Sequence, residues 1–370
     1  MSIILNMLKN KAKIAFTICL LIALSLVIPS MDSKAQTDDE NTITLTFGGD
    51  VTFGYKNENG YEGSMPHFLE ENGMDYSIIF RNVYDIFSND DLTVVNLETT
   101  ISDATSHMDK TYYFRAPYDY VNILKQGSIE AVSIANNHAN DYYEQGRTDT
   151  VRTLAENDIL VAGENYAASV EIKGIKIAIL GYVTFQTGFN YKSAIERDIP
   201  YMKKSHDIVI VMMHWGQELH YDANRGDINL AHKMVDLGAD LVIGHHPHVI
   251  QGIENYNGKY IAYSLGNCSF AGSSNPTNDD ILLFQQKFVK TEYGVEPAEA
   301  KVIPCRVSSQ KNVNDFQPTP FEGEEITRVL NRVLDFSSHM DYGLVTLTAD
   351  WMDKPYTRYD QKLESESGNQ

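Results

Sequence analysis

Short apolar runs alternate with amphipathic stretches through most of the chain after residue 42. Runs of four to eight residues rich in Val, Ile, Leu and Phe are typical of strands, and the stretches between them suit helices. The predicted strands are 42–47, 92–97, 131–135, 175–182, 207–213, 240–244, 259–265 and 281–288, and the predicted helices are 78–88, 118–126, 143–157 and 226–237. This alternation predicts an α/β domain over residues 43–290.

The pattern loosens beyond residue 291. Residues 303–325 are rich in loop formers and contain three prolines, a helical period returns at 324–340, and the apolar run 343–351 predicts one last strand. We interpret residues 291–352 as an appendage on the main domain. The polar residues 353–370 are expected to form a tail.

The first 35 residues are of a different kind. Three lysines precede an uncharged apolar run at 14–29, and the small residues Ser33 and Ala35 suit a cleavage site. The run is shorter than the roughly 20 residues of a membrane span and fits the core of an export signal. A cleaved signal peptide over 1–35, followed by a linker at 36–42, is favoured over a retained membrane anchor. Both alternatives place the rest of the chain outside the cytoplasm.

Charge and cysteine content narrow the range of functions. The formal net charge is −20, so the surface repels nucleic acid and anionic membranes. An anionic substrate would need a strongly positive local centre, which a metal can provide. Cys268 and Cys305 lie outside the signal and can form at most one disulfide, and the sequence leaves open whether they pair.

Side chains that can bind metals follow six of the eight predicted strands. They are Asp50, Glu98, Asn137 with His138, His214, the histidines 245, 246 and 248, and Asn267. Ligands of open α/β sheets bind at the carboxyl ends of the strands, where these residues are expected. Asp and Asn are also common turn residues, but His and Glu are not, so a binding site is favoured over chance turn composition.

The segment GHHPH, residues 244–248, has a geometry of its own. Alternate residues of an extended segment point to the same side, and Pro247 disfavours helical backbone at the residue before it. We therefore expect His246 and His248 to face one side as ligands. His245 should point away and support the ligands without binding the metal.

The predicted ligand set is rich in oxygen and nitrogen. It consists of Asp50, Glu98, Asn137, His214, His246 and His248. The absence of a thiolate and the number of histidines favour Mn, Fe or Zn over Ca. Six ligands exceed one tetrahedral zinc, so either two ions bridged by Glu98 or a single octahedral ion fits.

Three further polar residues have weaker support. Glu218 follows His214 by four residues and is a candidate to support the ligands, although a solvated loop acid fits equally well. Arg115 is a candidate to bind an anionic substrate, against the common alternative of a surface ion pair. Asn267 at a strand end either contacts the substrate or shapes a turn.

The motifs together resemble the CapA (PgsA) family of poly-γ-glutamate capsule biosynthesis proteins, part of the calcineurin-like metallophosphoesterase superfamily. The matching segments are GGDVTFGY (48–55), VVNLETTIS (94–102), FRAP (114–117), SIANNHANDY (133–142), MHWGQE (213–218), GHHPHVIQG (244–252) and YSLGN (263–267). The resemblance implies a sandwich of two mixed sheets flanked by helices, with a dinuclear metal site at the strand ends.

The resemblance also implies roles for individual residues. Asp50 and Glu98 stand at the first two carboxylate positions, Asn137 stands for the metal-binding asparagine, and the ligand histidines take the remaining positions. His138 matches the histidine that protonates the leaving group or holds the phosphate. Phosphoesterases begin with the motif D-x-H, whereas Thr52 stands two residues after Asp50, so one ligand of the first metal is missing.

Two main functions remain open at this point. The first is metal-assisted hydrolysis of a phosphoester or amide, with His138 as general acid. The second is non-catalytic, with the metal site holding carboxylates of an anionic polymer. The resemblance implies a role in capsule polymer synthesis or export beside membrane-bound polyglutamate synthase subunits. A degenerate site without function is the third and least favoured alternative.

Overall fold

The computed structural model describes residues 40–54, 61–185, 189–272 and 278–367. The predicted signal peptide or anchor and residues 36–39 of the predicted linker lie outside these ranges. The residues from Glu40 onward form one structural unit. Within the described ranges, no helix has the length and hydrophobicity needed to cross a bilayer.

Two mixed sheets form the framework. The larger sheet has the order β16-β15-β14-β1-β2-β5-β6, with β13 also paired to β1, and the smaller sheet has the order β11-β12-β10-β9-β8-β7. The strands are β1 (Thr42–Thr52), β2 (Leu92–Leu97), β3 (Thr100–Ile101), β4 (Arg115–Ala116), β5 (Ala131–Ser133), β6 (Leu160–Ala162), β7 (Ala168–Ile172), β8 (Ile175–Val183), β9 (Ile208–His214), β10 (Leu241–His245), β11 (Ile253–Tyr256), β12 (Lys259–Ala262), β13 (Asn267–Phe270), β14 (Asp280–Thr291), β15 (Gly294–Arg306) and β16 (Thr319–Pro320).

Parallel strands form the middle of each sheet. Strands β1, β2, β5 and β6 run parallel in the larger sheet, as do β8, β9, β10 and β12 in the smaller one, and antiparallel strands flank both groups. The helices are α2 (Met65–Glu71), α3 (Tyr84–Ser88), α4 (Val121–Gln126), α5 (Tyr143–Glu156), α6 (Tyr191–Met202), α7 (Arg225–Asp236), α8 (Glu324–Ser337) and α9 (Arg358–Ser367), with 3-10 turns η2 (Tyr76–Ile78) and η3 (Tyr118–Tyr120).

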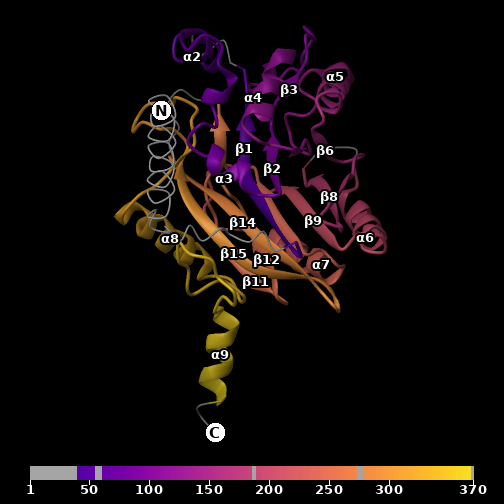
Figure 1. The fold of residues 1–370 in the computed structure, drawn as a ribbon, viewed down its shortest axis with the longest axis vertical. Helices are drawn as coiled ribbons and strands as arrows, with labels where there is room; N and C mark the ends of the chain where they lie inside the picture. The colour runs from indigo at the N-terminus through magenta and orange to yellow at the C-terminus, as the bar shows by residue number, and fades with distance from the viewer. Residues whose placement is uncertain (1–39, 55–60, 186–188, 273–277, 368–370) are drawn as a thin grey trace, which may run out of the picture. The chain divides into compact units, whose positions relative to one another are not determined.

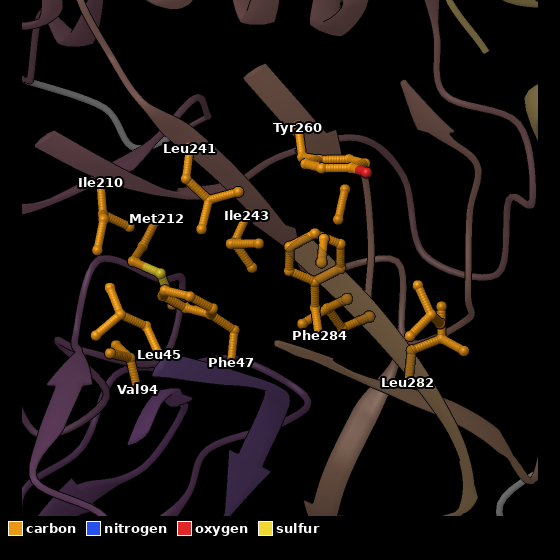
Figure 2. Close-up of a cluster of buried hydrophobic side chains, with 14 of the residues drawn as sticks. Leu45, Phe47, Val94, Ile210, Met212, Leu241, Ile243, Tyr260, Leu282 and Phe284 are labelled. Carbon is orange, nitrogen blue, oxygen red and sulfur yellow. The ribbon is translucent and has the colours of Figure 1, made fainter. Parts of the chain in front are cut away.

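The two sheets face each other across one apolar core. In β9, Ile208, Ile210 and Met212 point into this core, whereas the alternate residues of the strand point to the outer face. Figure 2 shows side chains from both sheets meeting there, among them Phe47 and Phe284 from the larger sheet and Ile243 from the smaller one. Strands buried on both faces explain why the apolar runs of the sequence are nearly continuous.

Helices cover the outer faces of both sheets. Apolar residues of α6 and α7 pack on the outer face of β8, β9 and β10, whereas α2, α3 and α4 pack on that of β1, β2 and β5. Figure 1 shows α6 and α7 beside the smaller sheet and α2, α3 and α4 beside the larger one. The predicted fold class, a sandwich of two mixed sheets flanked by helices, is confirmed.

Most predicted elements are present. All eight predicted strands occur, and β2 has the predicted bounds, while the predicted helix 78–88 is reduced to η2 and the short α3. The predicted strand at 343–351 is wrong, because this segment makes only isolated bridges at Gly343 and Leu344. A strand forms when several consecutive residues pair with a neighbouring strand, and β11 pairs with this segment only through the bridge between Glu254 and Gly343.

The segment after residue 290 is part of the sandwich. Strand β15 pairs with β14 along most of its length, so residues 292–293 are the turn of a β-hairpin inside the larger sheet. Helix α8 packs on β11 and β15, and its residues Val329 and Val333 enter the core between the sheets. The sheet therefore continues across residue 290, the predicted end of the main domain.

The order of the strands brings the strand ends of both sheets to one edge. Strands β1 and β13 lie side by side and parallel, with Asp50 opposite Asn267. Their close approach requires glycine, because a Cβ on Gly49 would lie 1.9 Å from the carbonyl oxygen of Gly266. Strands β9 and β10 pair so that His214 stands opposite His245.

Candidate metal centre

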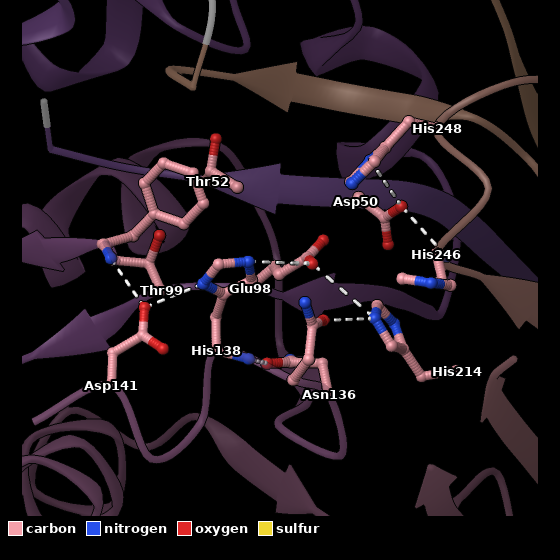
Figure 3. A network of polar contacts seen from close by, with 12 residues as sticks. Asp50, Thr52, Glu98, Thr99, Asn136, His138, Asp141, His214, His246 and His248 are labelled. Carbon is pink, nitrogen blue, oxygen red and sulfur yellow. Dashed lines mark hydrogen bonds and ion pairs between the residues drawn. The ribbon is translucent and has the colours of Figure 1, made fainter. Parts of the chain in front are cut away.

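The six predicted ligands lie together at this edge. Asp50 ends β1, Glu98 follows β2, Asn137 follows β5, His214 ends β9, and His246 and His248 follow β10. Figure 3 shows Glu98 between His138 and His214, with Asp50 and His248 on the other side of the site. Asn137 joins the group through its Oδ1, which lies 2.7 Å from Nε2 of His214.

These side chains form two overlapping groups of three. Glu98, His246 and His248 make one group, Asp50, Glu98 and His214 make the other, and within each group the ligand atoms lie within 4.8 Å of one another. Glu98 is the member that both groups share. Two groups joined by one carboxylate have the arrangement expected for two metal ions with a bridging ligand.

The carboxylate of Glu98 has no hydrogen bond among the described residues, although its side chain is fully buried. The nearest ring nitrogens are Nε2 of His214 at 3.6 Å and Nε2 of His138 at 3.8 Å from Oε1. A buried carboxylate without partners is costly unless a cation or proton compensates it. Together with the N/O donor set, this carboxylate fits a divalent metal.

Asp50 and His248 form an ion pair at the site. Asp50 Oδ2 lies 3.2 Å from Nδ1 of His248, and Oδ1 accepts a hydrogen bond from Asn96 at 2.7 Å. Burial would raise the pKa of Asp50, but the hydrogen bond and charge of His248 outweigh it and lower that pKa below its usual range. Burial likewise opposes protonation of His248, yet Glu98 and Asp50 raise its pKa to about 10.

Glu98 and the other two ligand histidines prefer their neutral forms in the metal-free protein. Burial and the charge of Asp50 raise the pKa of Glu98 well above its usual value. Burial, reinforced by neighbouring imidazoles, lowers the pKa of His214 and brings the pKa of His246 down to about 4. Neutral imidazoles can bind a metal directly, whereas Glu98 and His248 must release protons to do so.

The backbone at His246 and His248 differs from the expected extended strut. Strand β10 ends at His245, and φ is +98° at His246 and +56° at His248. The chain therefore turns at both residues. Positive φ values are strained for residues other than glycine, so the surrounding structure must hold this backbone in place. The two rings nevertheless lie 6.1 Å apart and reach the same group with Glu98.

His245 points away from this pair. Its ring nitrogens lie 3.3 Å from the carbonyl oxygen of Met213 and 3.2 Å from that of Gly48, so it links β9, β10 and β1. Thr52 also binds backbone through its side chain, because its hydroxyl accepts a hydrogen bond from Ala271 N at 2.7 Å. The Thr52 side chain stands where the resembled phosphoesterases carry a ligand histidine.

His138 is held by a carboxylate that the sequence reasoning missed. Nδ1 of His138 lies 2.7 Å from Oδ2 of Asp141, which also accepts a hydrogen bond from Phe114 N at 2.6 Å. Lys110 forms an ion pair with the other oxygen of Asp141. A ring that donates from Nδ1 directs Nε2 toward Glu98 and the site. Burial lowers the pKa of His138, partly offset by Asp141.

Two buried asparagines also escaped the sequence reasoning. Asn136 donates to Oδ1 of Asn96 at 3.1 Å and to the carbonyl oxygen of Leu97 at 2.9 Å. Its own Oδ1 accepts a hydrogen bond from His138 N at 3.0 Å, so these amides fix the loops that carry Glu98 and His138. Asn96 is the first residue of the motif NLE and Asn136 is the first residue of NNH, so the two motifs were the sequence signal that could have identified them.

A cavity of about 280 Å³ opens beside the candidate ligands. Its lining consists of Tyr112, Phe114, His138, Glu218, Leu219, His248, Asn267, Phe270, Gly272 and Asn278. Asn267 contacts His248 through Oδ1 at 2.9 Å from Nδ1. A larger cavity of about 440 Å³ lies near the C-terminal residues 353–360, away from these groups.

Arg115 does not line the cavity beside the ligands. Its guanidinium lies over the ring of Tyr142, 5.4 Å from the centroid, and donates to the carbonyl oxygen of Ala104 at 2.8 Å. Glu218 does line the cavity, at its exposed rim, and belongs to neither group of three. The predicted substrate residue Arg115 therefore lies outside the lining of this cavity, whereas Glu218, predicted to support the ligands, belongs to the lining.

Relatives and solved structures resemble this chain to different extents. The PGA biosynthesis protein CapA of Bacillus subtilis (strain 168) is 30% identical over 348 residues, which are 87% of this chain and 86% of that protein. The capsule biosynthesis protein CapA of Bacillus anthracis is 28% identical over 273 residues, 66% of this chain and 64% of that protein. A crystal structure of 5'-nucleotidase from Candida albicans SC5314 has 13% identity and a TM-score of 0.39, covering 70% of this chain and 51% of that one.

A family profile supplies the assignment. Residues 44–271 match the family described as "Bacterial capsule synthesis protein PGA_cap", and this range contains every candidate ligand. The match begins within β1 and ends just after β13, so it covers the parallel strands of both sheets. With a match over more than half of its length and a relative at 30% identity over most of its length, the chain belongs to the bacterial capsule synthesis protein PGA_cap family.

Proposed function

We propose that this chain is a metal-dependent hydrolase that acts outside the cytoplasm in the synthesis or export of a poly-γ-glutamate capsule polymer. The process is suggested by the family and by relatives named for PGA and capsule biosynthesis. The predicted export signal, as signal peptide or membrane anchor, supports the location. Membrane-bound synthase or export subunits are the proposed partners.

The observation that carries the hydrolase is the buried Glu98 carboxylate. It is shared by two groups of ligand atoms and has no hydrogen bond among the described residues. We propose two divalent ions, of Mn, Fe or Zn, held by Asp50, Glu98 and His214 on one side and by Glu98, His246 and His248 on the other. Such ions polarise a phosphoryl or carbonyl group and stabilise the charge that develops on it.

The chain's own residues supply the proton chemistry. His138 stands at the cavity with Nε2 directed to the site, where it can donate a proton to a leaving group. Asp141 holds the ring through Nδ1, so the orientation of His138 does not depend on the substrate. Asn137 lies against His214 and is positioned to complete the ligand set on that side.

A second candidate function is non-catalytic retention of an anionic polymer. It is favoured by Thr52, whose hydroxyl is hydrogen-bonded to the backbone and adds no imidazole ligand to the group around Asp50. A weakly held ion at that position would still attract carboxylates without assisting their hydrolysis. The acidic surface would then repel the polymer everywhere except at the centre.

One experiment separates the two functions. The purified protein, loaded with Mn²⁺ or Zn²⁺, is incubated with poly-γ-glutamate and with a simple phosphodiester, and the products are quantified. A hydrolase should turn over at least one of them, and His138→Ala should lose about 10²- to 10⁴-fold of the rate while keeping its metal. Polymer retention without turnover, lost on substitution of His246 and His248 by alanine, would reject the hydrolase in favour of retention.

A further inference from the structure

The lining of the cavity beside the ligands has an unusual composition for a site that receives a polyanion. Beside His138 and His248 it is formed mainly by aromatic and aliphatic side chains, among them Phe114 and Phe270, together with two asparagines and one acid, Glu218. Among the described residues that line it, there is no lysine or arginine. Once His248 has released its proton to bind a metal, the positive charge at this site comes from the proposed metals, and Glu218 adds a negative charge at the rim.

Phe114 and Phe270 form a continuous aromatic shelf next to the ligands. Their centroids lie 6.3 Å apart in an edge-on arrangement, Phe114 lies 4.5 Å from the ring of His138, and Phe270 lies 4.9 Å from the ring of His248. The shelf can receive a short aliphatic segment next to the metals. The faces of aromatic rings also attract cations rather than anions.

Glu218 is held at the rim by a loop with two fixed ends. Trp215 N donates to the carbonyl oxygen of His245 at 3.2 Å, and Leu219 N donates to that of Pro247 at 2.8 Å. Leu219 adopts φ = +61°, a backbone that a leucine adopts only where its surroundings impose it. These two bonds tie the loop to the segment that carries His246 and His248. They hold the backbone at Glu218 in a fixed place relative to both histidines.

The carboxylate of Glu218 is available for a ligand. It makes no hydrogen bond or ion pair with other residues in the described part of the chain, and it lines the cavity. An internal segment of a polyanion would place carboxylates against this negative rim, which is unfavourable.

We infer that the cavity selects a polymer end with a free amino group, whose ammonium binds Glu218 while the neighbouring carboxylate binds at the metals. The amino-terminal residue of a γ-glutamyl chain carries both groups on one carbon atom and continues with methylene groups that suit Phe114 and Phe270. This inference rests on the proposed function for the presence of the metals. It makes Glu218 a specificity residue of the substrate, rather than a support for the metal ligands.

The test compares two peptides that differ only at the amino group. Isothermal titration calorimetry on the metal-loaded full chain measures the Kd of a tri-γ-glutamate with a free amino terminus and of its N-acetyl derivative. We expect the free amine to bind about threefold to tenfold more tightly at low salt, with the difference shrinking as ionic strength rises. In Glu218→Gln the difference should fall below about twofold with the metal content unchanged.

A matched control is available in Glu292→Gln. Glu292 is exposed in the turn between β14 and β15, at the opposite end of β14 from Asn278 and the cavity, and its substitution removes the same charge. This variant should keep the preference of the wild type. Equal or tighter binding of the N-acetyl peptide, a preference that survives in Glu218→Gln, or no binding of either peptide to metal-loaded protein would overturn the inference.

The peptide affinities and the rate of hydrolysis are measured separately, so the amine selection and the hydrolase can fail independently. If the wild type prefers the free amine but hydrolyses neither poly-γ-glutamate nor a phosphodiester, the amine selection stands and the hydrolase is rejected. If it hydrolyses a substrate but shows no preference between the peptides, the hydrolase stands and the amine selection is rejected.

Discussion

Two fully buried glutamates in this fold have opposite surroundings. Glu254 in β11 is hydrogen-bonded to Nε2 of His232 at 2.8 Å, to the hydroxyl of Tyr263 at 2.6 Å and to Tyr342 N at 3.2 Å. Glu98 is equally buried and makes no hydrogen bond among the described residues. The first carboxylate ties α7, the residue after β12 and the C-terminal segment to β11, whereas the second lies near the imidazoles of His138 and His214.

The difference separates a structural acid from a binding acid. Burial alone is the same for both side chains, so burial does not identify the site. The partners do, because a carboxylate whose hydrogen bonds are complete stabilises the fold, and one without partners stabilises it only when a cation or a proton arrives. Substitutions that preserve shape and remove charge should therefore affect the two positions in different ways.

Glu98→Gln should have the largest effect on function. The amide cannot bridge two ions, so we expect metal affinity to fall by more than about a hundredfold and hydrolysis to fall with it. The metal-free variant should be at least as stable as the metal-free wild type, because burial already favours the neutral carboxyl at Glu98 and the amide is neutral at every pH. Elemental mass spectrometry and urea unfolding of the two metal-free proteins measure these outcomes. A clear loss of metal-free stability would show that Glu98 is a structural acid.

Asp141→Asn tests a third buried acid, whose partner is the proposed general acid His138. The amide no longer fixes the Nδ1–H form of His138, and we expect the rate to fall by about 10²-fold or more with metal content unchanged. Rates of the metal-loaded variant and wild type are compared over a range of pH. An unchanged rate would mean that the contact between Asp141 and His138 only stabilises the loop.

Glu254→Gln should affect stability without affecting the metal. The amide oxygen can still accept hydrogen bonds, but an amide N–H replaces one of the two carboxylate oxygens that face donors from His232, Tyr263 and Tyr342. We expect the free energy of unfolding to fall by about 2 kcal/mol. Urea unfolding gives this value, and the folded variant should bind as much metal as the wild type. A loss of metal in folded protein would erase the distinction between the two glutamates.

Asp90 should show the smallest effect, and it depends on pH. Burial, with the charges of Glu130 and Asp91 contributing, raises the pKa of Asp90 to about 7, so the folded protein holds this proton more tightly than the unfolded chain. The stability that protonation provides is complete below about pH 4 and is lost as pH rises through about 7. Asp90→Asn should therefore gain about 1 kcal/mol over the wild type at pH 8 and little at pH 4, after allowance for solvent screening. Equal gains at both pH values in urea unfolding would contradict the raised pKa.

Much of the sandwich could be predicted from local patterns. The strands of the two parallel groups are apolar on both faces, so continuous runs such as 92–97 in β2 identified them from composition alone. Strand β15 was missed because half of its residues are only partly buried and it carries two prolines, Pro297 and Pro304, which disfavour strand. Its pairing with β14 depends on long-range contacts that no local pattern contains.

The candidate site could be predicted in its residues but not in its hydrogen bonds. Polar residues after six strands predicted which side chains meet at one edge, because strand ends converge in an α/β fold, and the metal-binding role of these residues stays a prediction. The turn at His246 could not be predicted from Pro247, since tertiary contacts such as the bond from His246 N to Asp50 Oδ2 at 3.1 Å impose it. Asp141 and Asn136 act through other side chains, and such supporting roles leave no spacing rule in the sequence.

The most direct test of the central claim is the metal content of the purified wild-type protein, measured by elemental mass spectrometry beside Glu98→Gln and Glu254→Gln. The account predicts close to two transition-metal ions per chain in the wild type and in Glu254→Gln, and a loss of most of the metal in Glu98→Gln. No bound metal in the wild type after exposure to Mn²⁺, Fe²⁺ and Zn²⁺, or equal metal in both variants, would contradict it.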